Sequence, residues 1–187
     1  MASLFASTHN TRFLPGSGER LIRSDAPLHL TGDEIRWLRA RGVTTLVDLR
    51  SEAEATAQPC CLEGVPGFTC LHMPVTGGNR VPQSVEDVVD GYLRMVDDSM
   101  ERIVDTILGA KTGVMYFCAV GKDRTGMVSA MLMRRLGRPD EEIVRDYMAS
   151  GENLQTVLED YAKAHPEVTL EVMLPCEEKI RAVLCKI

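Results

Sequence analysis

Apolar residues along this 187-residue chain form two kinds of pattern, short apolar-rich stretches and longer stretches at helical spacing. Short apolar-rich stretches are typical of strands in a parallel sheet, and they occur at 20–23, 43–49, 68–75 and 114–118, of which 114–118 is unbroken. Apolar residues three and four apart predict amphipathic helices, and these begin near 32, 84, 125, 140, 152 and 176. The alternation predicts an α/β fold with a mostly parallel sheet of about four to five strands, flanked by helices.

Polar residues at the ends of the helical stretches predict the helix boundaries. Thr31 and Glu34 have the spacing of a capping box, and Ser84 is a typical N-cap residue. Gly137 and Pro139 are expected to end the helix that begins near 125. Three more helices are expected at the end of the chain, namely Asp140–Ser150, Glu152–Ala164 and Cys176–Cys185. Because no linker, charge block or repeat divides residues 1–187, we expect a single domain.

The loop that follows the run at 114–118 has the sequence Cys-Ala-Val-Gly-Lys-Asp-Arg-Thr-Gly. Backbone N–H groups that curl toward a helix N-terminus can bind a phosphate without a metal ion. Arg124 adds a planar fork for two phosphoryl oxygens, and the same positive surroundings favour the thiolate of Cys118, which is a nucleophile. Thr125 places a hydroxyl where it could steady the sulfur as it leaves. The expected phosphate-binding residues are Ala119, Val120, Gly121, Lys122, Asp123, Arg124 and Thr125.

The spacing between Cys118 and Arg124 is weak evidence by itself, because a chain with several cysteines often produces it by chance. Of the six cysteines, however, only Cys118 has an arginine six places further on, and its loop also contains an internal glycine and a following Thr-Gly pair. The alternative is a buried cysteine at the end of a strand, beside a solvated arginine. The strand before the loop and the helix after it favour the phosphate site.

With these residues, the loop resembles the signature of the cysteine-dependent protein tyrosine phosphatase superfamily, in particular its bacterial and fungal tyrosine/dual-specificity branch. The segments 21–25 and 42–52 are similar to the "R-S … D-L-R-S-x-x-E" pattern of that branch. Two positions depart from it: Phe117 replaces the usual histidine, and the N-terminal "N-F-R-D" segment survives only loosely around Asn10 and Arg12. The resemblance implies a tyrosine-phosphatase-like fold and a metal-independent phosphomonoester hydrolase with a phosphocysteine intermediate and no cofactor.

The general acid that protonates the leaving group has three candidates. The resemblance favours Asp123, within the loop itself. Asp48 ends a predicted strand at the same sheet edge as Cys118, but it could equally form a supporting ion-pair network with Arg50 and Glu54. Asp87 has the sequence separation of a mobile acid loop, although its capping-box position favours a role at a helix end.

The resemblance implies a phosphorylated protein, with phosphotyrosine as the first choice, or a phosphoinositide or inositol phosphate as substrate. Lys122 could bind a second phosphate on such a ring or could simply be solvated. Two other readings stay open: a phospho-binding module with little turnover, and a rhodanese-like sulfur carrier, whose loop commonly lacks this spacing to arginine. Oxidised Cys118 could form a disulfide with Cys60, Cys61 or Cys70, although buried free thiols are commoner.

Composition and charge argue against nucleic-acid binding, a metal site and a membrane span. The net charge of −6 provides no basic stripe for nucleic acid, and the cysteines and histidines lack the spacing of a zinc site, so no metal is expected. No basic leader and no run of about 18 apolar residues occurs, which predicts no membrane span. A thiol catalyst needs a reducing compartment, so we expect a cytoplasmic protein, with leaderless export left open. The oligomeric state is not indicated.

Overall fold

A five-stranded sheet forms the centre of the computed structural model, which describes residues 2–77 and 82–187. The strands are β1 (Arg12–Phe13), β2 (Leu21–Ser24), β3 (Val43–Asp48), β4 (Thr69–His72) and β5 (Gly113–Phe117). Their order is β1-β2-β5-β3-β4, with β1 antiparallel to β2 and all other neighbours parallel. The prediction of a mostly parallel sheet flanked by helices is confirmed.

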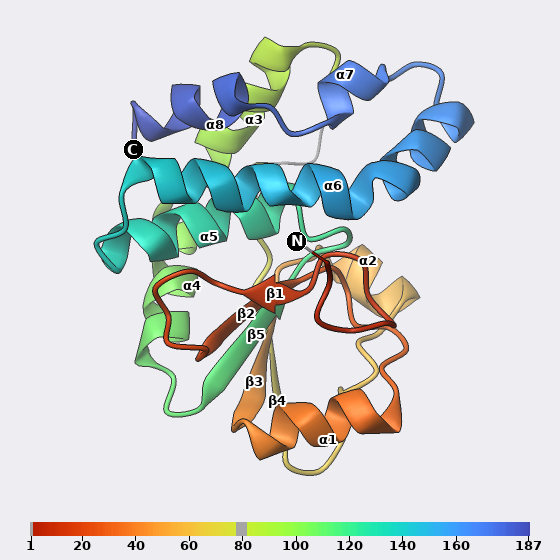
Figure 1. Cartoon of the computed structure of the whole chain (residues 1–187), viewed down its shortest axis with the longest axis vertical. Coiled ribbons are helices and arrows are strands. Elements are labelled where there is room, and N and C mark those ends of the chain that lie inside the picture. The colour runs from red at the N-terminus through yellow and green to blue at the C-terminus, as the bar shows by residue number, and fades with distance from the viewer. Residues whose placement is uncertain (1, 78–81) are drawn as a thin grey trace.

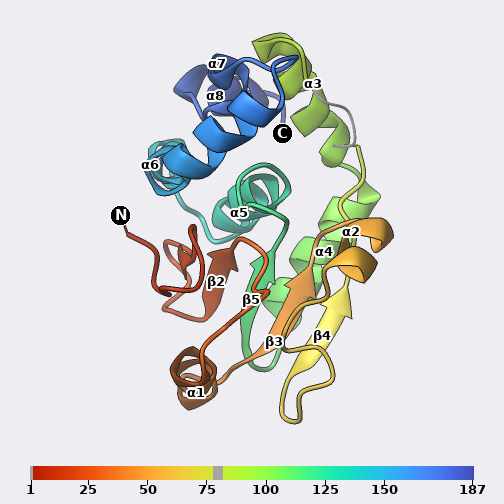
Figure 2. The same cartoon turned by 90° about the vertical axis from the view of Figure 1, so that its right-hand side faces the viewer.

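Helices cover both faces of this sheet (Figures 1 and 2). Helix α1 lies on one face, α4 and α5 lie on the other, and α3, α6 and α8 pack beyond α5. The helices are α1 (Gly32–Ala40), α2 (Glu52–Ala57), α3 (Val85–Met95), α4 (Asp98–Gly109), α5 (Asp123–Arg135), α6 (Asp140–Ala164), α7 (Leu170–Met173) and α8 (Glu177–Leu184).

The central strand β5 is buried at every residue because it faces helices on both sides. Val114 and Tyr116 pack into the cluster that includes α4 and α5, whereas Met115 and Phe117 pack into the cluster that includes α1. Side chains alternate between the two faces of a strand, so both faces must be apolar here. The unbroken apolar run in the sequence follows from this double burial.

The capping box at Thr31 and Glu34 is confirmed, since each side chain accepts a hydrogen bond from the other residue's backbone N–H. The separate helices expected on either side of Gly151 are wrong, because α6 runs through it without a break. A Cβ atom at Gly151 would lie 3.3 Å from Pro175 Cγ, so the glycine permits the segment before α8 to pack closely against α6. Strand β1 and helices α2 and α7 were not predicted.

Parallel strands bring their carboxyl ends to one edge of the sheet, and the register shows which ends meet there. Phe117 of β5 is paired with Ser24 of β2 and with Asp48 of β3. Cys118 therefore leaves the sheet between two neighbouring strand ends, directly before α5. Ligands of such sheets bind at this edge.

Candidate active site

The loop between β5 and α5 curls tightly under the N-terminus of α5. Cys118 is only 2% exposed at the start of the loop, and Asp123 begins the helix. Gly121 has φ +70, and a Cβ atom there would lie 2.6 Å from the backbone of Ser24 and Asp25. Only glycine fits this close approach to β2. The side chain of Lys122 does not cap α5, so the first amides of the helix face the loop without a side-chain acceptor from that residue.

The carbonyl oxygen of Gly121 is held from behind by the N-terminal part of the chain. Arg23 Nη2 donates to it over 2.7 Å, and Asn10 Nδ2 donates to it over 2.9 Å. Asn10 is fixed in turn by its backbone N–H, which donates to Asp25 Oδ1 over 2.8 Å. All four residues are buried or nearly so. The loosely matched segment around Asn10 therefore supports the loop directly.

Two buried guanidinium groups share one carboxylate in the same layer. Arg12 Nε donates to Asp146 Oδ1 over 2.9 Å, and Arg23 Nη1 donates to Asp146 Oδ2. Burial alone would raise the pKa of Asp146, but the charges of Arg23 and Arg12 outweigh it and lower that pKa. Burial and the charge of Arg23 lower the pKa of Arg12 to about 10. This ion triad connects β1, β2 and α6 behind the loop.

Arg124 forms a two-bond ion pair with a carboxylate from the next helix along the sheet edge. Its Nη1 and Nη2 donate to Glu54 Oε2 and Oε1 over 2.6 and 2.7 Å. The hydrogen bonds from Arg124 lower the pKa of Glu54 to about 2. Burial opposes the charge on Arg124, but the bonds to Glu54 and the nearby charge of Cys118 outweigh it and raise the pKa of Arg124. A guanidinium has five N–H donors, so three remain for a ligand.

Asp123, the acid candidate within the loop, contacts two neighbouring side chains. Its Oδ1 accepts a hydrogen bond of 2.5 Å from Tyr92 Oη and lies 3.1 Å from Lys122 Nζ. Lys122 also donates to the backbone carbonyl of Met173, and only 8% of its side chain is exposed. The side chain of Lys122 is therefore engaged within the protein, unlike the freely solvated lysine considered above.

Asp48 is held as a structural group. Both of its oxygens accept hydrogen bonds from the Arg50 guanidinium, and Oδ1 also accepts from the Arg50 backbone N–H. It lines a small cavity of about 240 Å³ beside β4, together with Cys60 and His72. The expected pair of Asp48 with Arg50 forms, but Glu54 binds Arg124 instead of joining it. This cavity is separate from the cleft that Arg124 lines.

The main cleft has a volume of about 890 Å³ and opens above Arg124. Asp87, the third acid candidate, lies in its wall, where it also accepts a hydrogen bond from the Gln83 backbone at the start of α3. The floor and walls come from α2, α3, the loop, α5 and the segment around α7. The residues that line it are Ser51, Glu54, Gly77, Pro82, Gln83, Asp87, Val88, Asp90, Gly91, Tyr92, Arg94, Met95, Lys122, Asp123, Arg124, Tyr161, Val168, Val172 and Met173.

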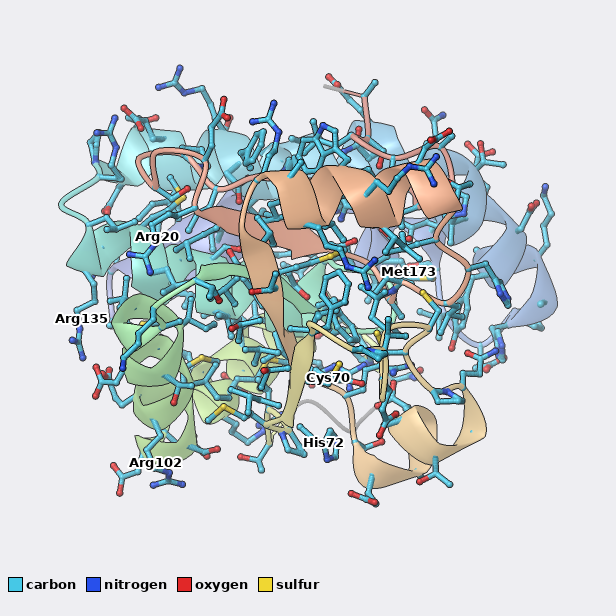
Figure 3. The ribbon with its side chains drawn as sticks, turned by 90° about the horizontal axis from the view of Figure 1, so that it is seen from below. Arg20, Cys70, His72, Arg102, Arg135 and Met173 are labelled. Atoms are coloured by element: carbon cyan, nitrogen blue, oxygen red, sulfur yellow. The ribbon has the colours of Figure 1, made fainter. Side chains whose placement is uncertain are left out.

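The other cysteines suggested as partners of Cys118 lie on the opposite face of the sheet. Cys60 and Cys70 pack in the cluster that includes α1, whereas Cys118 packs in the cluster that includes α5. Cys70 sits on the edge strand β4 with His72, as Figure 3 shows, and its register partner is Leu46 of β3. The thiols of Cys60 and Cys70 are near enough for each to shift the pKa of the other, that of Cys60 upward and that of Cys70 downward. A disulfide from Cys118 to either of them would require a backbone movement that brings the two faces of the sheet together.

Sequence reasoning missed the residues that act behind the loop. Tyr92, Tyr147 and Asp146 were not singled out as site residues, and Tyr92 occurs at helical spacing among apolar residues. Their polar atoms offered a signal, since a tyrosine hydroxyl or a carboxylate on a core face needs a buried partner. Thr125, which was expected to act on the sulfur, has a buried hydroxyl with no hydrogen-bond partner in the part of the chain that the structure describes.

The sequence of this chain is similar to those of known phosphatases. A "Tyrosine-protein phosphatase" of Nostoc commune is 27% identical over 136 residues, which cover 67% of this chain and 46% of the relative. The "Triple specificity protein phosphatase PtpB" of Mycobacterium tuberculosis is 27% identical over 183 residues, covering 77% of this chain and 64% of the relative. The chain thus spans about half to two thirds of the length of these relatives.

The fold is shared with the crystal structure of kinase associated phosphatase, at a TM-score of 0.50 and 11% identity over 95% of this chain and 93% of that one. The sequence profile of the Tyrosine phosphatase family matches residues 17–185, which is nearly the whole chain. The chain therefore belongs to the Tyrosine phosphatase family.

Proposed function

We propose that this domain, taken as a single unit, hydrolyses phosphate monoesters of proteins through a phosphocysteine intermediate. The observation that carries the proposal is the loop itself. Cys118 lies at the carboxyl end of β5, and Arg124 projects from the first turn of α5 into the cleft. The helix N-terminus, its amides and Arg124 together favour a dianionic phosphoryl group at this point.

In the first step, the thiolate of Cys118 attacks phosphorus, an S–P bond forms, and the bond to the ester oxygen breaks. The backbone N–H groups of residues 119–124 and the three free N–H donors of Arg124 bind the equatorial oxygens as charge builds. Glu54 fixes the plane of the guanidinium from the other side. Holding the fork in place before the substrate arrives lowers the cost of ordering it.

Asp123 protonates the departing oxygen, and it then accepts a proton from the water that releases inorganic phosphate. Its place in the cleft beside Arg124 supports this role, and the retention of Asp48 by Arg50 argues against that residue. The hydroxyl of Thr125, which has no hydrogen-bond partner among the described residues, is available to donate to the sulfur of Cys118 as the S–P bond breaks.

The charges around the cleft favour a phosphoprotein over an inositol polyphosphate. Among the described lining residues, the carboxylates of Glu54, Asp87, Asp90 and Asp123 outnumber the three cations. One of these cations, Lys122, is already bound by Met173 and Asp123. The segment around α7 adds an apolar wall suited to a tyrosine ring, made by Val168, Val172 and Met173. The names of the two relatives, both protein phosphatases, support the same choice.

A phosphate-release panel tests this proposal. Phosphotyrosine peptide, phosphoserine peptide, phosphoinositide and inositol polyphosphate are each incubated with the protein and a chelator, and with Cys118→Ser as the control. We expect phosphotyrosine peptide to be hydrolysed fastest, with hydrolysis abolished in Cys118→Ser. Activity should survive the chelator because Arg124 and the amides supply the positive charge. Hydrolysis that persists in Cys118→Ser would contradict the mechanism, and a preference for inositol polyphosphate would contradict the substrate class.

A further inference from the structure

Two tyrosines from different helices meet at the carboxylate of Asp123. Tyr92 Oη of α3 donates to Asp123 Oδ1 over 2.5 Å, and Tyr147 Oη of α6 lies 3.0 Å from Tyr92 Oη. The two rings pack edge to face with centroids 6.2 Å apart, and each residue is 2% exposed. This is a line of three polar groups that begins in the core and ends in the cleft.

The direction of the hydrogen bonds follows from the number of protons. Each phenol has one O–H, and the O–H of Tyr92 is used on Asp123, so Tyr147 must donate its own to the oxygen of Tyr92. Burial and the nearby charge of Asp123 raise the pKa of both phenols, which therefore stay protonated. Tyr92 remains a hydrogen-bond donor throughout the working pH range of an enzyme.

Only one of the two carboxylate oxygens of Asp123 is bound by these side chains. Tyr92 Oη and Lys122 Nζ both bind Oδ1. Oδ2 is the oxygen that these contacts leave to carry a proton to the leaving group. A carboxylate on a helix N-terminus can rotate about its side-chain bonds, and a fixed Oδ1 would limit that rotation. The orientation of the acid would then depend on α3, although the acid itself belongs to α5.

We propose that Tyr92 is a positioning residue, which holds Asp123 so that Oδ2 faces the ester oxygen. The inference rests on the proposed function of the site. In the reaction, the proton moves from Asp123 Oδ2 to the leaving oxygen, while the proton of Tyr92 stays in its bond to Oδ1. Neither tyrosine forms or breaks a covalent bond.

The test compares Tyr92→Phe with its matched control Tyr147→Phe. Each change removes one buried hydroxyl from the same contact and keeps the ring, but only Tyr92→Phe removes the bond to Asp123. We expect Tyr92→Phe to lower kcat for phenyl phosphate about tenfold or more, and kcat for p-nitrophenyl phosphate by less than about threefold, because a good leaving group needs little protonation. Its KM should not change. Tyr147→Phe should stay near wild type on both esters.

A double-substitution cycle with Asp123→Asn separates positioning from general packing. If Tyr92 acts through Asp123, the change Tyr92→Phe should slow phenyl phosphate in the wild-type background and have little further effect in Asp123→Asn. An equal loss on both esters, or an undiminished loss in Asp123→Asn, would overturn the inference. The proposed function is judged separately, by turnover in the wild type and its loss in Cys118→Ser.

Discussion

At the scale of single residues, the ion pair of Glu54 and Arg124 fixes the geometry of the phosphate site. The sequence indicated that both residues matter but placed Glu54 beside Asp48 and Arg50. Which carboxylate binds which arginine depends on side-chain directions across the ends of β3 and β5, and spacing along the chain does not contain that information.

Replacing Glu54 by Gln should reduce kcat/KM on the order of tenfold, because the guanidinium of Arg124 loses its fixed plane. Stability should respond to pH as well. Since the folded pKa of Glu54 is about 2, below its ordinary value, the ion pair stabilises the fold fully above about pH 5 and loses this effect as pH falls toward 2. The Tm difference between wild type and variant should therefore shrink between pH 6 and pH 3. Glu52→Gln, an exposed change on the same helix, is the control: it should leave kcat/KM unchanged, and its effect on Tm should be small because its ion pair with His72 is exposed.

Substitution of the two competing aspartates should separate their roles. Asp123→Asn should slow unactivated aryl phosphates by roughly 10²–10⁴ and a nitrophenyl ester much less, as expected for a proton donor. Asp48→Asn should slow all esters by the same factor or lower Tm, because it weakens the buried pair with Arg50. Steady-state kinetics over a series of leaving groups distinguishes these patterns. The reverse result would transfer the acid role to Asp48.

At the scale of elements, helix α6 supports the loop through the ion triad of Asp146, Arg12 and Arg23. Asp146→Asn should destabilise the protein by about 3–5 kcal/mol, because two buried guanidinium groups lose their shared carboxylate. Denaturant unfolding measures this change. Asp160→Asn, an exposed substitution on the same helix that removes only a surface ion pair with Lys163, should stay within about 0.5 kcal/mol of wild type. Equal stabilities of the two variants would mean that the triad does not stabilise the fold.

Local patterns predicted the elements well where burial is regular. The runs at 43–49 and 114–118, the cap at Thr31 and the helix after the loop are all found in the structure. The unbroken helix through Gly151 was missed because a glycine alone favours a break, whereas this glycine allows close packing against Pro175, 24 positions away. Contacts such as Arg12 with Asp146, which are 134 positions apart, leave no local periodic signal.

At the scale of the whole molecule, the sheet separates two thiol environments. Cys118 packs on the side of α5, and Cys60 and Cys70 pack on the side of α1. No helix among residues 2–77 and 82–187 is long and apolar enough to cross a membrane. In the same described residues, no three histidine, cysteine or acidic side chains gather in a way that could hold a metal ion.

Mild peroxide should inactivate the protein by converting the thiolate of Cys118 to a sulfenic acid, and a thiol reductant should restore activity. Cys70→Ser should be inactivated and restored to the same extent as wild type, because the sheet lies between Cys70 and Cys118. Activity assays before and after reductant, with mass mapping of the oxidised peptides, measure this. Loss of recovery in Cys70→Ser, or a mapped Cys118–Cys70 disulfide, would contradict the separation of the two sites.

The phosphocysteine intermediate is the central claim, and rapid acid quenching followed by peptide mass mapping tests it most directly. During turnover of a nitrophenyl ester, we expect one phosphoryl group on the peptide that contains Cys118, at a level that rises and then falls as substrate is consumed. The Cys118→Ser protein should carry none while it still binds the ester. A phosphoryl group on another residue, or full turnover with an unmodified Cys118 peptide, would contradict the claim.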